Sequence, residues 1–431
     1  MNTIRPTGAR HIVVAMLCLG AAIVYLSRNC LGVAVADGQI LDDLNLSKKQ
    51  IGLVMGFGFF LFYSIFQVPS GWLGQRIGSR RILTLILLSS SILTALMGMV
   101  TALAGIMVIY LGIGMVQSGI FPCSAKTAKS WVPKTRLALM GGALGSFMSV
   151  GGALASMLCG VLLGWTSWRV VFFLFAIPGI IWAIAFYWWF RDEPGDHSSV
   201  NSDELNLITG GDMKPVKDST GAIPWRAMAS TPAMWWLCGQ QFFRAAGYIF
   251  YSTWFPTFLR ETRGVSTESA GFLSSLPMLA VVVSCVSGGA FVDYLQRKTG
   301  SRRISRQYVA IACMLACAGF ICLAYFAETT TMAVLMISAG SFCASFGGPC
   351  QYVTTIDMAD RDTAVVYGVV NMAGNIGAAL FPVVVPYLVA SSGWDAVLFT
   401  FAGIYVAAAV CWALLNPYAT LQNPYATKAA A

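Results

Sequence analysis

A stretch rich in glycine and arginine lies between two long apolar runs: Gly71-Trp-Leu-Gly74-Gln75-Arg76-Ile-Gly78-Ser-Arg80-Arg81. A related stretch, Gly289-Ala-Phe-Val-Asp293 followed by Arg302 and Arg303, lies between two apolar runs much later in the chain. The two copies indicate that one unit has been duplicated. We call residues 71–81 the first signature loop and residues 289–303 the second.

The runs around these loops are long enough to cross a bilayer, since a spanning helix needs about 20 mostly apolar residues. The chain is 57% hydrophobic and 10% charged, where a soluble protein carries about 25% charged residues. This composition excludes a water-soluble enzyme and predicts an all-α integral membrane protein. We expect twelve transmembrane helices, at 12–36, 51–74, 82–101, 105–128, 138–164, 168–190, 233–259, 270–293, 307–327, 332–356, 365–390 and 393–415.

One long polar stretch divides these spans six and six. We expect an N-terminal half at 1–190, a cytoplasmic linker at 191–231, a C-terminal half at 232–416 and a disordered tail at 417–431. Pro122-Cys123 and Pro349-Cys350 occupy equivalent places in the halves, and each is followed at nearly the same distance by a tryptophan, Trp168 or Trp394. The halves are therefore expected to be pseudo-symmetric six-helix bundles.

The distribution of the 27 lysine and arginine residues predicts the orientation. Most fall in segments on the same side as the N-terminus, which the positive-inside rule assigns to the cytoplasm. We expect both termini to be cytoplasmic, in a bacterial inner membrane. The net charge of +9 is then topological, and a nucleic-acid partner is excluded. The twelve cysteines lie in apolar stretches without a CxxC pair, so neither a metal site nor a cofactor is expected.

Two charges stand inside the expected spans, Arg28 and Arg244. An arginine at a helix centre costs about 2.5–3.5 kcal/mol on insertion scales, so the pair costs roughly 5–7 kcal/mol. One interpretation is that each side chain snorkels or bonds to carbonyls. The other is that both line a water-filled cavity and bind an anionic substrate, because a guanidinium binds a carboxylate or phosphate with two parallel hydrogen bonds.

Polar side chains at helical spacing accompany the two arginines. Each set alone is also typical of interhelical hydrogen bonding, but together with the arginines they favour a pocket lined by hydroxyl and amide groups. The candidate substrate-binding residues are Arg28, Arg244, Tyr25, Tyr63, Gln67, Gln117, Gln240, Tyr248, Asn371 and Asn375.

The chain resembles the major facilitator superfamily, whose best-known signature matches the first signature loop. A closer resemblance is to its anion:cation symporter family, which includes sialin, the vesicular glutamate transporters and bacterial sugar-acid carriers. The matching stretches include Tyr25-Leu-Ser-Arg28, Gln67-Val-Pro69, Phe121-Pro122, Trp131-Val-Pro133, Trp254-Phe-Pro256-Thr-Phe-Leu259 and Asn371 with Asn375.

The resemblance implies the major facilitator fold and transport by alternating access, with Arg28 and Arg244 contacting the substrate anion. It also implies gating roles for the signature loops. The candidate gating residues are Gly71, Arg76, Gly78, Arg80 and Asp293.

The sequence departs from this family at three acidic positions. Proton-coupled members commonly have Asp before the first arginine and Glu ahead of the Phe-Pro pair, where this chain has Ser27 and Gln117. In the first signature loop, Gln75 stands where members of the family usually have an acidic residue. Because serine and glutamine do not exchange protons near neutrality, proton symport by these groups is disfavoured.

We therefore expect a secondary transporter of small organic anions that works as a uniporter or anion exchanger, and not an enzyme. Two alternatives stay open: a proton- or sodium-coupled organic anion symporter, and a receptor on the same fold that binds the anion without moving it. The expected partners are the anion and the lipid bilayer, with the chain as a monomer.

Overall fold

The computed structural model describes residues 5–47, 50, 54–55, 59–210 and 221–422, and these residues form helices and no strand. They divide into two compact units. Unit 1 contains residues 1–134, 147–223 and 361–368, and unit 2 contains residues 135–146, 224–360 and 369–431. This division differs from a cut at the linker, because the first turns of two long helices belong to the unit of the other half.

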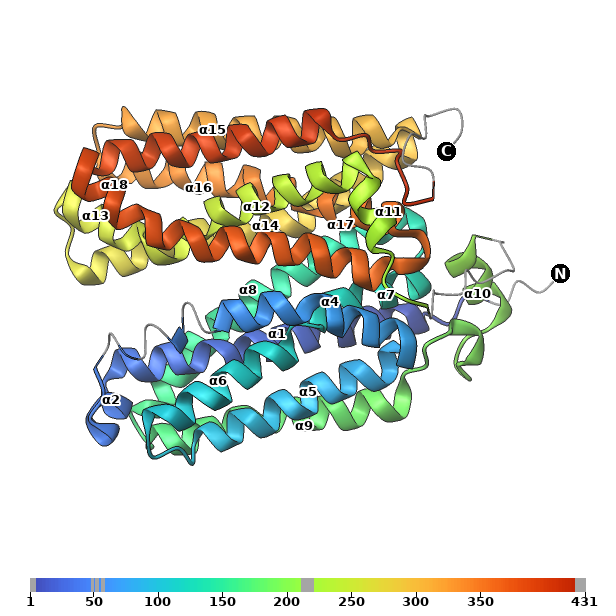
Figure 1. Ribbon diagram of the computed structural model, residues 1–431, viewed down its shortest axis with the longest axis horizontal. Coiled ribbons are helices and arrows are strands. Elements are labelled where there is room, and N and C mark those ends of the chain that lie inside the picture. Colours follow the sequence, from blue (N-terminus) through green and yellow to red (C-terminus); the bar gives the residue numbers. More distant parts are fainter. Residues whose placement is uncertain (1–4, 48–49, 51–53, 56–58, 211–220, 423–431) are drawn as a thin grey trace. The chain divides into compact units, whose positions relative to one another are not determined.

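Unit 1 is built from the helices of the N-terminal half (Figure 1). They are α1 (Ala9–Asp37), α2 (Gln39–Leu44), α4 (Phe59–Ile77), α5 (Ser79–Met97), α6 (Leu103–Gln117), α7 (Ile120–Trp131), most of α8 (Leu137–Leu163), α9 (Trp168–Trp189) and the linker helix α10 (Ser202–Thr209). Helix α5 packs along α9 and α4 along α6. The expected start of the second span, 51–58, lies largely outside the described residues.

Unit 2 is built mainly from the helices of the C-terminal half. They are α11 (Trp225–Ser230), α12 (Pro232–Thr253), α13 (Phe255–Arg263), α14 (Thr267–Thr299), the π-turn η4 (Arg303–Tyr308), α15 (Val309–Tyr325), α16 (Thr330–Phe346), α17 (Gly348–Ala359) and most of α18 (Thr363–Leu414). Helix α14 packs along α16, and α15 along the other side of α16.

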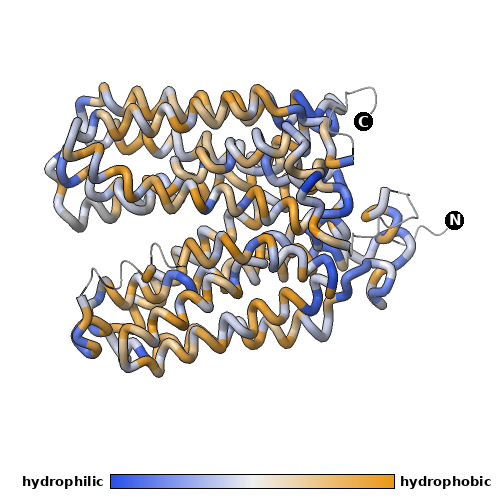
Figure 2. Tube along the Cα trace, viewed as in Figure 1, coloured by the Kyte–Doolittle hydropathy of each residue, from blue (hydrophilic) through white to orange (hydrophobic). Residues whose placement is uncertain are grey.

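The outer faces of these helices are apolar, as a bilayer requires. Val108, Ile181 and Val283 are each more than 60% exposed, and hydrophobic residues run along the helices while hydrophilic ones gather at their ends (Figure 2). Such a surface is stable only in contact with lipid. Eight helical segments of the described chain are long and apolar enough to cross a membrane.

The last of these eight segments, Thr330–Leu414, contains three of the expected spans. It includes α16, α17 and α18, and α18 itself is two helices joined at Gly393, whose backbone is not helical (φ 77°, ψ −179°). Two further expected spans, in α4 and α12, are not among the eight segments, because polar residues such as Gln67 and Arg244 lower their mean hydropathy. The architecture agrees with twelve spans.

Three expected spans are broken into two helices each, which the sequence analysis did not anticipate. The breaks lie between α6 and α7, between α12 and α13, and between α16 and α17. In each case a proline, Pro122, Pro256 or Pro349, stands in the first turn of the second helix. A proline is tolerated there because the N–H that it lacks would have no partner within the helix.

The duplication is visible in two equivalent tryptophan contacts. In unit 1, Trp168 Nε1 donates to Asp43 of α2 at 2.9 Å. In unit 2, Trp394 Nε1 donates to Glu261 of α13, also at 2.9 Å. Each acid lies on the short helix that follows the first long helix of its half. Together with the neighbouring Arg169, this hydrogen bond holds the pKa of Asp43 below its ordinary value.

The chain end differs from the expected disordered tail. Tyr418 and Ala419 are buried in unit 2, and the Leu421 N–H donates to the Met358 carbonyl at 3.0 Å. The expectation therefore does not hold for residues 417–422, while residues 423–431 lie outside the described residues.

The linker is anchored to the start of α1 by one carboxylate. The α1 N-cap is Gly8, which has no side chain to accept the free N–H groups of the first turn. The Glu204 side chain of α10 is fully buried, accepts from the Gly8 and Arg10 N–H groups at 3.1 and 3.2 Å, and pairs with the Arg10 guanidinium. The linker thus supplies the missing cap.

Glu204→Ala should lower the free energy of unfolding by about 1–3 kcal/mol, because partly buried donors of Gly8 and Arg10 are left without an acceptor. Thermal unfolding of the purified protein in detergent measures this change. Asp203→Ala, in the same helical turn, is the matched control and should unfold close to the wild-type temperature. Equal unfolding temperatures for all three proteins would contradict this capping role.

Candidate functional site

Arg28 sits in a cage of aromatic rings within unit 1. Its guanidinium carbon lies 4.2–5.3 Å from the ring centroids of Tyr25 on α1 and of Phe59, Phe60 and Tyr63 on α4. Aromatic faces attract a cation through the ring quadrupole, by about 2 kcal/mol or more when water is excluded. Arg28 is half-buried, so the cage offsets part of the cost of its charge without neutralising it.

No carboxylate pairs with Arg28 among the described residues. Its backbone is held separately, since the Tyr110 hydroxyl donates to the Arg28 carbonyl at 3.3 Å. The ring contacts leave the N–H groups at the edge of the guanidinium plane available as donors. This is the arrangement that a bound carboxylate or sulfonate group would complete.

Arg244, on α12 in unit 2, is held by an amide in place of a cage. Its Nε and one terminal nitrogen donate to Gln241 Oε1 at 3.3 and 3.1 Å. Glutamine is neutral, so this contact orients the fork and leaves its charge uncompensated. Gly348, at the start of α17, faces the guanidinium: a Cβ there would lie 3.7 Å from its NH1.

Gln67 is a fully buried amide on the same helix as two of the rings around Arg28. It follows Tyr63 by one helical turn and lies near the Tyr63 hydroxyl. Among the described residues, neither its oxygen nor its nitrogen lies within hydrogen-bonding geometry of a partner. A buried amide without partners costs stability, which suits a group that a ligand would satisfy.

Gln117 and Ser27 are in direct contact. Gln117 Nε2 donates to Ser27 Oγ at 3.2 Å and to Ser90 Oγ at 2.8 Å, and Ser27 donates to the Val24 carbonyl at 3.0 Å. The two positions at which the resemblance implied acids are thus adjacent in space. Here they form a neutral group that bonds within the protein, so the nitrogen of Gln117 is already occupied.

The remaining candidates in unit 2 are spread over two helices. Gln240 is fully buried and donates to the Leu237 carbonyl at 3.1 Å, and its oxygen has no partner in the described part of the chain. Tyr248 donates to the Met278 sulfur at 3.8 Å. The Asn375 side chain donates to the Asn371 backbone carbonyl at 2.8 Å, within α18. The side chains of Asn371 and Asn375 are both half-buried.

Each signature loop holds the start of a helix that begins in the other half. In unit 2, Asp293 accepts from the Ala138 and Leu139 N–H groups at 3.1 and 2.8 Å, which caps α8. In unit 1, Gln75 donates to the Arg361 carbonyl at 2.8 Å, just before α18. The second contact is not a helix cap, because the Gln75 amide nitrogen donates to a carbonyl and accepts none of the free N–H groups at the start of α18.

The other gating candidates set the shape of the first signature loop. A Cβ at Gly71 would lie 2.5 Å from the Ala364 carbonyl oxygen, so α4 and α18 pack backbone to backbone there. Gly78 has φ +90°, and Asp192 fills the space beside it.

The two arginine candidates of this loop contact aromatic rings. The Arg80 N–H donates to Asp192 at 3.0 Å, and the Arg80 side chain stacks on Tyr187. Arg76 is exposed and stacks on Trp72.

Sequence reasoning missed three side chains that touch the arginines. Phe59 and Phe60 read as ordinary apolar residues, although Phe59 precedes Tyr63 by four residues and so shares its face of α4. Gln241 precedes Arg244 by three residues, a spacing that brings side chains together on a helix. Helical spacing alone was therefore enough to find Phe59 and Gln241.

Comparison with protein families decides the identity. The model of the Major Facilitator Superfamily matches residues 17–302 and 299–430. The chain belongs to the Major Facilitator Superfamily. The expectation of a membrane transporter rather than an enzyme is thereby confirmed.

Curated members of this superfamily align along nearly the whole chain. A probable sulfoacetate transporter of Cupriavidus necator is 26% identical over 418 residues, covering 96% of both chains. A probable galactarate/D-glucarate transporter of Bacillus subtilis is 28% identical, covering 95% of this chain and 92% of its own. A D-galactonate transporter of Escherichia coli is 26% identical, covering 96% and 97%. All three are named for small organic anions, as the sequence predicted.

Solved structures of the superfamily have the same fold. The proton:xylose symporter XylE aligns with a TM-score of 0.75 at 14% identity, covering 96% of this chain and 98% of its own. The human organic anion transporter MFSD10 aligns with a TM-score of 0.71 at 15% identity, covering 94% and 99%.

Proposed function

We propose that this protein transports a small organic anion of the sugar-acid or sulfonated-carboxylate class across a bacterial inner membrane by alternating access. The termini are cytoplasmic in this proposal, and the transporter is a monomer. The observation that carries it is that Arg28 and Arg244 lie in membrane helices without an acidic partner among the described residues.

The surroundings of the arginines support an anion over other substrates. Arg28 is stabilised by aromatic faces and Arg244 by a neutral amide, and both environments keep the positive charge. A bound carboxylate or sulfonate supplies the missing charge at each guanidinium. Gln67 and Gln240, with polar atoms that lack partners, would then hydrogen-bond the hydroxyl groups that sugar acids carry.

The neutral contact between Ser27 and Gln117 supports transport without proton coupling. Neither group titrates between about pH 4 and 9, and they bond to each other. We therefore favour uniport or anion exchange.

Arg28→Ala and Arg244→Ala should each abolish uptake of the transported anion into proteoliposomes. Removing one partner of a desolvated charged pair costs about 2–5 kcal/mol, which is roughly a 30- to 4,000-fold loss of affinity. Uptake of labelled sulfoacetate, galactarate, galactonate and hexuronate measures this loss.

Two kinds of control variant accompany the alanine variants. Lysine replacements should retain part of the uptake, because they keep the positive charge but lose the paired donors of the guanidinium. Arg260→Ala, an exposed arginine on α13, is the control. Normal uptake by both alanine variants would overturn the anchor assignment.

Gly348→Asp should weaken anion binding as strongly as Arg244→Ala, because its carboxylate would reach the guanidinium and replace the substrate anion. An acid in the first turn of α17 also suits the helix dipole, so folding should be preserved. Anion-dependent thermal stabilisation measures binding. Gly348→Asn has the same shape without the charge and should bind close to normally; loss of binding in both variants would point to steric blockage.

Uptake driven by a trans-loaded anion should vary by less than roughly twofold between pH 5.5 and 8, because the substrate carboxylate stays ionised over this range. A protonophore should leave the rate unchanged. The double variant Ser27→Asp with Gln117→Glu should introduce a pH-dependent rate. A wild-type rate that depends on an imposed proton gradient would contradict uncoupled transport.

A further inference from the structure

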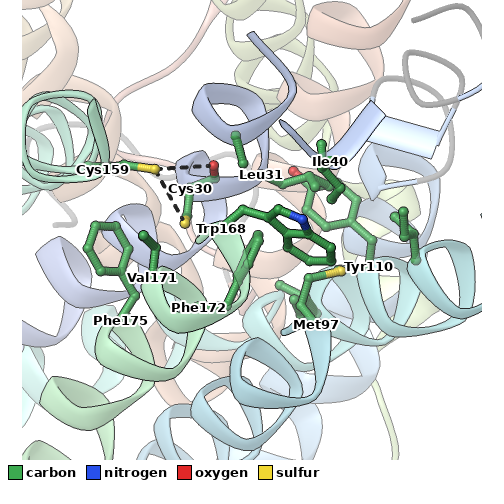
Figure 3. Packing of buried hydrophobic residues seen from close by; sticks show 14 of the residues in the cluster. Cys30, Leu31, Ile40, Met97, Tyr110, Cys159, Trp168, Val171, Phe172 and Phe175 are labelled. Carbon is green, nitrogen blue, oxygen red and sulfur yellow. Dashed lines mark hydrogen bonds between the residues drawn. The ribbon is translucent and has the colours of Figure 1, made fainter. Parts of the chain in front are cut away.

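Two thiols of unit 1 lie against each other in its core. Cys30 of α1 and Cys159 of α8 are 0% exposed, their sulfur atoms are 3.8 Å apart, and the Cys159 sulfur also lies 3.8 Å from the Cys30 carbonyl oxygen (Figure 3). Both thiols belong to a hydrophobic cluster whose other members are apolar and aromatic residues such as Val171, Phe172 and Phe175 (Figure 3). Neither thiol contributes to the proposed anion chemistry.

The helices that carry these thiols pack backbone to backbone. A Cβ at Gly151 of α8 would lie 2.2 Å from the Ala22 carbonyl oxygen of α1, and one at Gly152 would lie 2.8 Å from the Asn29 amide nitrogen. Glycines two turns before Cys159 thus let α8 approach α1 closely, which agrees with the 3.8 Å between the two sulfur atoms. A bond of about 2.05 Å then requires the sulfurs to approach by about 1.8 Å, which is within the reach of side-chain rotation and a small helix shift.

We propose that Cys30 and Cys159 are a redox-active dithiol that hydrogen peroxide converts to a disulfide, and that this bond slows transport. One sulfur attacks a peroxide oxygen, the O–O bond breaks, and the proton of that thiol joins the departing hydroxide, which gives one water and a sulfenic acid. The second sulfur then attacks the sulfenic sulfur, the S–O bond breaks, and the proton of the second thiol joins the departing hydroxide to give a second water. The two sulfurs together lose two electrons, which the peroxide accepts.

The position of the pair explains why the bond acts on transport. Cys30 follows Arg28 by two residues on α1, and the Tyr110 hydroxyl already fixes the Arg28 carbonyl in the same turn. A disulfide to α8 would fix this turn from a second side. In the proposed orientation both thiols lie toward the outer ends of their helices, near the compartment that is oxidising in bacteria.

The linkage is tested by treating the purified protein with hydrogen peroxide and digesting it without reduction. Mass spectrometry should detect a peptide joining Cys30 to Cys159, lost on adding dithiothreitol and absent from Cys30→Ser and Cys159→Ser. Cys18→Ser is the matched control, because Cys18 is also buried on α1, and it should still form the linkage. Failure to detect the linked peptide in wild type overturns the proposal, whatever the transported anion proves to be.

The effect on transport is tested on the same samples in proteoliposomes. Peroxide should lower wild-type uptake by about fivefold, since helix movements limit many turnover rates, and dithiothreitol should restore it. Uptake by Cys30→Ser and Cys159→Ser should resist peroxide, and uptake by Cys18→Ser should respond like wild type. A linked protein that transports at the unmodified rate would overturn the switch. If no anion is transported at all, the proposed function fails while the linkage is still measured.

Discussion

An arginine inside a membrane helix must recover a cost of about 2.5–3.5 kcal/mol, and the structure meets this constraint twice without using an acid. Four aromatic rings surround Arg28, whereas Gln241 accepts two hydrogen bonds from Arg244. Both solutions spread or orient the charge and leave it uncancelled. An acid beside either arginine would have neutralised the guanidinium and removed its attraction for an anion. The buried amides of Gln67 and Gln240 are polar without carrying a negative charge, so they leave this attraction intact.

The acids of the described chain are used at helix ends instead. Glu204 caps α1, Asp293 caps α8, and Asp43 and Glu261 anchor the tryptophans that begin later spans. Asp357 pairs with Arg302 and Arg306 at the end of α17. At these places a carboxylate meets free N–H groups or a cation, and these partners offset the cost of its desolvation. Negative charge thus fixes the fold at helix ends, and the two charges inside the expected spans, Arg28 and Arg244, are positive.

The sequence predicted the architecture well because a bilayer demands long apolar runs, and the duplication repeats Pro122 at Pro349 and Trp168 at Trp394. It predicted the breaks at these prolines poorly, since an apolar run reads the same whether one helix or two cross it. The arginines were evident as rare charges among apolar residues. The cage was only partly evident: the four-residue spacing places Phe59 on the face of Tyr63, whereas Phe60 differs from a packing residue only in what it faces. The contact between Ser27 and Gln117 joins helices 90 positions apart, a distance that spacing along one helix cannot reveal.

That contact also bears on the energetics of the proposed transport. An anion bound to a fixed guanidinium carries its charge with it, because the neutral pair supplies no proton to accompany it. Each elementary charge crossing the membrane is worth about 2.3 kcal/mol per 100 mV, and in a bacterium with a negative interior this opposes the entry of an anion. Uniport would then favour efflux or need a steep gradient. Exchange of two anions of equal charge moves no net charge, so its free energy depends on the two concentration gradients alone, and it suits a transporter whose usual acidic positions are serine and glutamine.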